Sequence, residues 1–84
     1  MTNNEIIKKQ LIYRSTHRGT KEMDLLLGNF VRQNIDSLNK SDLVDLKYLL
    51  DLEDEILQDW YNQKTTKSLI PINKISKMFK KFKI

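Results

Sequence analysis

The sequence predicts an all-α fold, a single compact bundle of five short helices. Two glycines and one proline among 84 residues are too few for the many tight turns of an all-β domain. Apolar residues instead recur at three- and four-residue intervals, which is the spacing of one helical face. Because a chain of this length has room for one modest hydrophobic core, we expect a single domain over residues 1–84.

Two helices are predicted in the N-terminal part of the chain, over residues 5–16 and 21–35. Thr20 is a suitable N-cap for the second helix, because its hydroxyl oxygen can accept a hydrogen bond from a free backbone N–H. Glu22 and Asp24 then place negative charge in the first turn, where the helix dipole favours it. The apolar positions that share a face are Ile7 and Leu11 in the first helix and Met23, Leu26, Leu27, Phe30, Val31 and Ile35 in the second.

Three further helices are predicted, over residues 40–51, 54–62 and 71–82. Asn39 can cap the first of them, with Asp42 as the acidic half of a capping box. Each segment again has an apolar face. The positions on these faces are Leu43, Leu46, Leu49 and Leu50, then Ile56, Leu57, Trp60 and Tyr61, and finally Ile72, Ile75, Met78, Phe79 and Phe82.

Trp60 and Pro71 carry two more structural expectations. Trp60 is the only tryptophan, and its place on an apolar helical face makes it the expected core anchor. Residues 62–68 are polar and basic without periodicity, which indicates a loop. Pro71 is suited to the first turn of the last helix, because the N–H that proline lacks has no intrahelical partner there.

Charge is segregated along the chain, which carries +4 overall. Residues 36–59 carry −6 and residues 60–84 carry +7, so we expect attraction between the acidic helices and the last one. The pI near 9.4 and the lysine-rich last helix also leave open a small basic regulator that binds nucleic acid. Against that alternative, the three arginines all lie before residue 33, whereas base recognition relies on bidentate arginine contacts.

Several classes of site are excluded or disfavoured by composition. The absence of cysteine excludes disulfides, thiolate metal sites and a cysteine nucleophile. A single histidine, His17, cannot form an imidazole cluster, and the acidic residues 51–55 lack the glycine-centred turn of a calcium loop, so we expect no metal. No segment approaches the roughly 18 apolar residues of a membrane span, and the N-terminus does not resemble a secretory signal. We therefore expect a cytoplasmic protein.

The segment around Gly19 is the strongest candidate for a functional site. Polar and charged side chains gather there, at a turn between two amphipathic helices, and such turns often carry recognition surfaces. Ordinary capping explains the same residues equally well: Gly19 could supply a positive φ, and Arg18 could be an exposed loop arginine worth no more than about 1 kcal/mol. A third alternative is an enzyme that uses Glu22 and His17 as acid and base. The candidate residues are Arg14, His17, Arg18, Gly19, Glu22 and Asp24.

Two motifs give the chain a resemblance to a known family. Residues 13–24 read YRSTHRGTKEMD, and residues 49–60 read LLDLEDEILQDW. The first resembles the pattern aromatic-R-S-x-R-R-G-M-x-E-x-D of the SdhE-like succinate dehydrogenase assembly factors, or flavinylation factors. The second resembles that family's leucine pair, acidic turn and tryptophan-terminated helix. His17 and Thr20 depart from the pattern, which usually has arginine and methionine at these positions.

The resemblance implies a small helical bundle that assists an enzyme and is not one itself. Such a protein binds the flavoprotein subunit of succinate dehydrogenase, and in some bacteria that of fumarate reductase. It promotes covalent attachment of FAD to a histidine of that subunit, so FAD is the cofactor of the client and is not stably bound here. By the same resemblance Arg18 and Glu22 contact the client, and Gly19 lets the backbones approach. We expect a bacterial protein that is monomeric when free.

Overall fold

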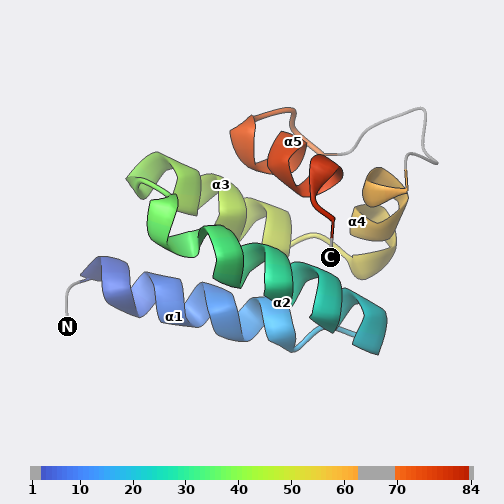
Figure 1. Ribbon diagram of the computed structural model, residues 1–84, viewed down its shortest axis with the longest axis horizontal. Coiled ribbons are helices and arrows are strands. Elements are labelled where there is room, and N and C mark those ends of the chain that lie inside the picture. The colour runs from blue at the N-terminus through green and yellow to red at the C-terminus, as the bar shows by residue number, and fades with distance from the viewer. Residues whose placement is uncertain (1–2, 63–69, 84) are drawn as a thin grey trace.

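The computed structural model describes residues 3–62 and 70–83, and over these ranges the chain is helical without any strand (Figure 1). The all-α prediction is confirmed. A 3-10 turn over Ile35–Ser37 follows the second helix. The α-helices of the described part are α1 (Asn3–Thr16), α2 (Lys21–Asn34), α3 (Lys40–Leu50), α4 (Asp54–Tyr61) and α5 (Lys74–Lys81).

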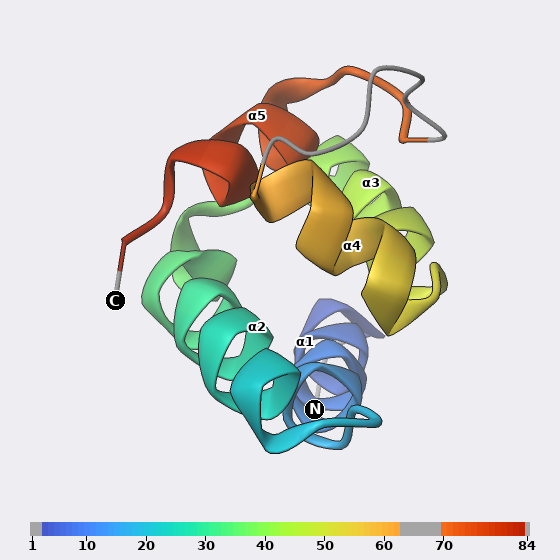
Figure 2. The same ribbon diagram turned by 90° about the vertical axis from the view of Figure 1, so that its right-hand side faces the viewer.

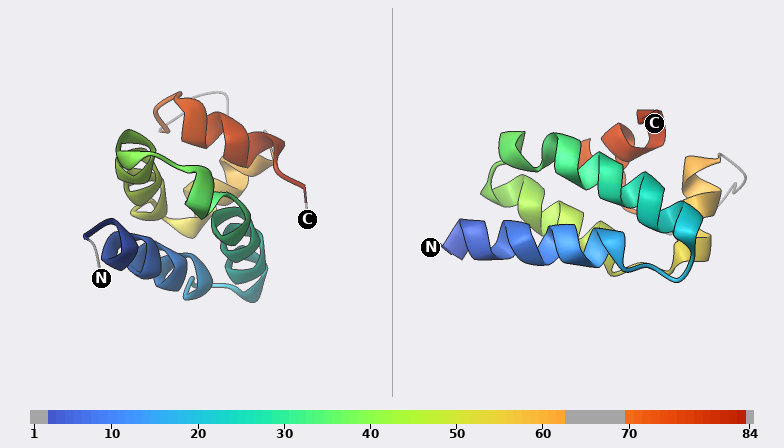
Figure 3. Two further views of the ribbon diagram at one scale, coloured as in Figure 1. Left: turned by 60° about the vertical axis from the view of Figure 1, so that its left-hand side comes forward. Right: turned by 60° about the horizontal axis from the view of Figure 1, so that its bottom comes forward.

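The helices pack around one interior, which is visible when the molecule is viewed end-on (Figure 2). Helix α1 packs against α2 and α3, α3 also packs against α5, and α4 packs against α5. Helix α3 therefore lies between the N-terminal and the C-terminal helices (Figure 3, left). The resulting body measures 41 × 25 × 20 Å.

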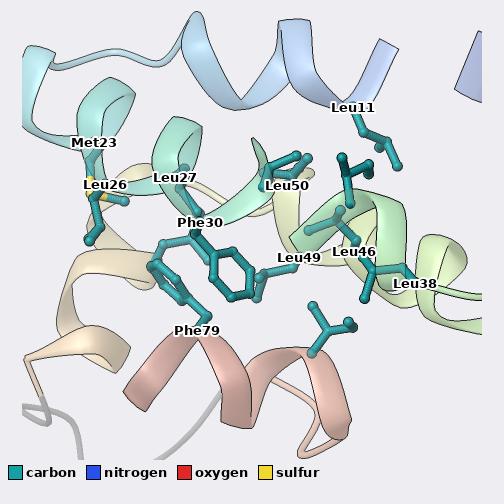
Figure 4. Close-up of a cluster of buried hydrophobic side chains, with 14 of the residues drawn as sticks. Leu11, Met23, Leu26, Leu27, Phe30, Leu38, Leu46, Leu49, Leu50 and Phe79 are labelled. Atoms are coloured by element: carbon teal, nitrogen blue, oxygen red, sulfur yellow. The ribbon is translucent and has the colours of Figure 1, made fainter. Parts of the chain in front are cut away.

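The core is formed by apolar side chains from all five helices, and Figure 4 shows the part of it that lies between α1, α2, α3 and α5. Helix α2 contributes most, because it buries five large apolar side chains and Ile35 follows directly after it. The rings of Phe30 and Phe79 lie 5.4 Å apart between α2 and α5, a favourable separation for a tilted aromatic pair. The three- and four-residue spacing thus predicted the buried face of α2 correctly, at Met23, Leu26, Leu27, Phe30, Val31 and Ile35.

Two of the predicted helix caps are confirmed. The Thr20 hydroxyl accepts a hydrogen bond from the Met23 N–H at 3.2 Å, and α2 begins at the next residue. Asn39 and Asp42 form a reciprocal capping box, in which each side chain accepts a hydrogen bond from the backbone N–H of the other, at 2.8 and 3.2 Å. Both caps satisfy backbone donors that a helix start leaves without an intrahelical partner.

The start of α5 differs from the prediction. The helix begins at Lys74, so Pro71 is not in its first turn, and Ile72 is 67% exposed instead of lying on the apolar face. The physical reason is a second capping box: Asn73 accepts from the Ser76 N–H at 2.9 Å, and Ser76 accepts from the Asn73 N–H at 3.0 Å. The other helix bounds agree with the prediction to within two residues, and residues 63–68 of the predicted loop lie outside the described residues.

Trp60 lies in the core, with 7% of its surface exposed. Its indole N–H donates to the Ser76 carbonyl at 3.0 Å, which ties α4 to α5. The ammonium group of Lys80 lies 4.2 Å from the centroid of the indole ring, close enough for a cation–π interaction. One lysine of the basic last helix therefore has a structural role.

The expected attraction between acidic and basic helices is present at one contact. Lys74 at the start of α5 donates to Asp42 of α3 over 3.1 Å. This hydrogen bond from Lys74 is the main cause that holds the pKa of Asp42 below its ordinary range, while burial acts in the opposite direction and the Asn39 backbone N–H assists. Asp42 thus caps α3 and connects it to α5.

Candidate functional site

The turn between α1 and α2 lies against the turn between α3 and α4 (Figure 3, right). The two turns correspond to the two sequence motifs, residues 13–24 and 49–60. The two turns are more than thirty residues apart in the chain. They are joined by hydrogen bonds from Arg18 and Gly19 to Leu50 and Asp54. The site is therefore built from both motifs together.

Arg18 makes most of this contact, and we call its set of hydrogen bonds the Arg18 clamp. Its Nε donates to Oδ1 of Asp54 at 2.7 Å, Nη1 to the Leu50 carbonyl at 2.6 Å, and Nη2 to the Leu52 carbonyl at 2.7 Å. Leu50 is the last residue of α3, so the guanidinium satisfies a carbonyl that has no intrahelical partner. The Arg18 side chain is only 11% exposed. The expectation of an exposed loop arginine is wrong.

Gly19 approaches the same carboxylate through its backbone. Its N–H donates to Oδ2 of Asp54 at 2.7 Å, and a Cβ on residue 19 would lie 3.1 Å from that oxygen. The φ of Gly19 is not in the positive region, so the alternative that glycine is needed for a left-handed turn is wrong. A close approach within the chain's own fold accounts for the glycine instead.

Asp24 and Arg14 also make contacts within the fold. The Asp24 carboxylate accepts a hydrogen bond from the backbone N–H of Arg18, which closes the turn from the side of α2. Arg14 forms an ion pair with Asp51, and both side chains remain partly exposed, at 38% and 51%. Arg14, Arg18 and Gly19 therefore hold the two turns together, and Asp24 closes the first turn.

His17 folds back on its own helix. Its Nδ1 lies 2.8 Å from the Tyr13 carbonyl and 3.1 Å from the Thr16 hydroxyl, and its ring stacks on Tyr13 with centroids 3.8 Å apart. Tyr13 is 62% exposed, so the stack presents an aromatic surface to solvent. These contacts engage His17 with Tyr13 and Thr16 rather than with Glu22.

Glu22 is the exception among the predicted site residues. It is exposed in the first turn of α2, and it makes no hydrogen bond or ion pair with any residue that the structure describes. The hydrogen-bonding capacity of its carboxylate is therefore available to another molecule. Among the six predicted residues, it best fits a direct contact with a partner.

Asp54, Leu50 and Leu52 complete the site, although the sequence does not predict them there. Asp54 is 19% exposed and both of its carboxylate oxygens accept hydrogen bonds, so it is not a solvated charge at a helix junction. The available signal was that residues 49–60, which contain all three, resemble the second motif of the same family. Spacing along the chain could not show that they touch.

A family model described as flavinator of succinate dehydrogenase matches residues 9–83. The chain belongs to this family. This match confirms the family resemblance that the two motifs indicated.

Curated relatives agree with this membership. The chain is 40% identical over 53 residues to the FAD assembly factor SdhE of Acetobacter pasteurianus, covering 63% of this chain and 49% of the relative. It is 42% identical over 67 residues to the mitochondrial succinate dehydrogenase assembly factor 2 of Dictyostelium discoideum, covering 74% and 48%. It is 39% identical over 54 residues to the corresponding protein of Arabidopsis thaliana, covering 64% and 29%. The chain thus spans half or less of these relatives, and no solved structure gives a significant match.

A groove lies between α1 and α3. Its volume is about 230 Å³, and Arg14 is one of the residues that line it. This volume is below the roughly 300–1,000 Å³ of typical small-molecule sites. Within residues 3–62 and 70–83, no cluster of acidic or histidine side chains could hold a metal, and no helix is long and apolar enough to cross a membrane.

Proposed function

We propose that this protein binds the flavoprotein subunit of succinate dehydrogenase and promotes covalent attachment of FAD to it. The observation that carries the proposal is the family match over residues 9–83, which includes both motifs of the site. The geometry supports it, because Glu22, which is exposed and has no partner among the described residues, follows a turn that the Arg18 clamp holds in place. A fixed turn with one free carboxylate is suited to recognising a partner.

The proposed mechanism is positioning, and the chain itself is not the catalyst. Oxidised flavin would supply both the electrophile and the electron acceptor: as a histidine nitrogen of the client bonds to a flavin carbon, a C–H bond there is broken, its proton leaves and its electron pair reduces the flavin. The step depends on correct orientation of the histidine against the flavin. This chain would hold the client subunit in that geometry through Glu22 and the neighbouring turn. FAD is the client's cofactor in this proposal.

We extend the proposal to three finer points. The fumarate reductase flavoprotein is a second client, because it presents the same chemistry of flavin and histidine. The free protein acts as a monomer in the bacterial cytoplasm. The chain does not bind nucleic acid. In support of this, Lys74 and Lys80 of the basic last helix interact within the fold, with Asp42 and with the Trp60 ring.

The direct test is reconstitution of flavinylation. The purified client subunit without flavin is incubated with FAD, in the presence and absence of this protein, and covalent flavin is read as in-gel fluorescence after denaturation. We expect the fluorescence of the client band to rise faster when the protein is present. Equal rates with and without the protein would refute the proposal.

A further inference from the structure

We propose that Asp54 is a positioning residue, which fixes the turn between α1 and α2 so that Glu22 meets the client in the correct place. The inference rests on the proposed function and adds a residue from the second motif to its machinery. Asp54 does not need to touch the client for this role. It acts through Arg18 and Gly19, which it holds at the same time.

The two oxygens of the Asp54 carboxylate divide the task. Oδ1 accepts from the Arg18 side chain and Oδ2 from the Gly19 backbone, each at 2.7 Å. The bond to the Gly19 N–H acts on the main chain itself, and therefore on the path by which the chain enters α2. Glu22 follows three residues later, within the first turn of that helix. A displacement of Gly19 would thus move the Glu22 carboxylate with it.

Asp54 itself is well fixed. It is the first residue of α4, where the helix dipole stabilises a negative charge. The same helix is anchored in the core by Leu57, which is fully buried, and by Trp60, whose indole is bonded to Ser76. Helix α4 therefore fixes the position of the turn that precedes Glu22 relative to the hydrophobic core.

The expected effect is large because positioning depends steeply on geometry. A misplacement of about 1 Å can lower a rate on the order of 100-fold when the chemistry itself is unchanged. Asparagine at position 54 would keep one acceptor oxygen, but its NH₂ group would face one of the two donors. One of the two bonds would be lost, and the turn would be released on that side.

The test compares Asp54→Asn with Glu55→Gln in the reconstituted flavinylation assay. Both changes remove one negative charge from the first turn of α4, but Glu55 is exposed and has no partner among the described residues. Rates are measured at a temperature where circular dichroism shows each variant to be folded. We expect Asp54→Asn to lower the rate about 10- to 100-fold and Glu55→Gln to leave it within about twofold of wild type. Equal rates for the two variants would overturn the inference.

A double-mutant cycle distinguishes positioning from simple loss of stability. If Asp54 acts through the turn that presents Glu22, Asp54→Asn should cost little in a chain that already carries Glu22→Gln. Independent, multiplicative effects of the two changes would contradict this route. Should Asp54→Asn fail to fold, Gly19→Ala tests the same contact, because its Cβ would press on the Asp54 carboxylate. A fully active Gly19→Ala protein would then overturn the inference.

The wild-type protein separates this inference from the function on which it rests. If the wild type does not promote flavinylation, the proposed function fails and the role of Asp54 fails with it. If the wild type is active and Asp54→Asn is equally active, only the role of Asp54 fails.

Discussion

Replacing Arg18 with alanine should destabilise the fold strongly, although it changes a residue in a surface turn. The change removes three charge-assisted hydrogen bonds and leaves Asp54 without its guanidinium partner. Breaking a well-buried ion pair typically costs about 3–5 kcal/mol, and hydrogen bonds to charged groups contribute about 1.5–3 kcal/mol each. Because Arg18 and Asp54 keep 11% and 19% exposure, water can partly replace the lost partners. We expect a net loss of about 2–4 kcal/mol.

A loss of that size would be readily measured in this domain. An 84-residue protein has a free energy of unfolding of about 4–13 kcal/mol, so Arg18→Ala would remove a large share of it. Urea unfolding followed by far-UV circular dichroism gives the midpoint and the slope. Arg32→Ala is the matched control, because Arg32 is exposed on α2 without a partner among the described residues, and it should change stability by no more than about 0.5 kcal/mol. Equal midpoints for the two variants would show that the Arg18 clamp contributes nothing to the fold.

The remaining predictions concern the core, the loss of stability at acid pH and the surface that contacts the client. Trp60→Ala should lower the free energy of unfolding by about 3–5 kcal/mol, read from the urea midpoint; an unchanged midpoint would mean that the indole is not packed. Since the lowered pKa of Asp42 makes the unfolded chain take up the proton first, stability should be complete at neutral pH and fall as the pH drops below the ordinary aspartate range. Asp42→Asn should flatten that fall in a series of urea midpoints against pH, and an identical slope would refute the role of Lys74. Glu22→Ala should change the free energy of unfolding by no more than about 1 kcal/mol. It should nevertheless lose about 2–5 kcal/mol of client binding, a thirty- to several-thousand-fold rise in Kd measured by titration. Full client binding by that variant would remove Glu22 from the interface.

Local signals predicted much of the fold. The buried face of α2 follows from side-chain spacing alone, because a helix in contact with a core buries positions three and four residues apart. The Asn39 and Asp42 capping box is equally local, since both partners lie within one turn. The start of α5 was predicted wrongly where two local signals competed. Pro71 fits the first position of a helix. The helix instead begins three residues later, at Lys74, because the Asn73 and Ser76 side chains cap it there.

The candidate site was harder to predict, because its contacts are not local. Arg18 meets Asp54 across 36 positions, and charge and spacing around Arg18 give no information about such a partner. An arginine beside a glycine turn therefore indicated an exposed side chain. Its burial follows from the packing of the two turns, which only the folded chain defines. Glu22 has no such contact within residues 3–62 and 70–83, and its exposed position in the first turn of α2 could be predicted from sequence.

The close approach of Gly19 to Asp54 has a consequence for how these proteins can vary. Glycine is required at position 19 because a Cβ there would press on the Asp54 carboxylate, and not because the backbone has a positive φ. If the carboxylate at position 54 were lost, a side chain at position 19 would find room, and Arg18 would lose one of its acceptors. Positions 18, 19 and 54 should therefore change together across relatives, as one inherited unit that spans both turns. A substitution at one of them would favour compensating substitutions at the others.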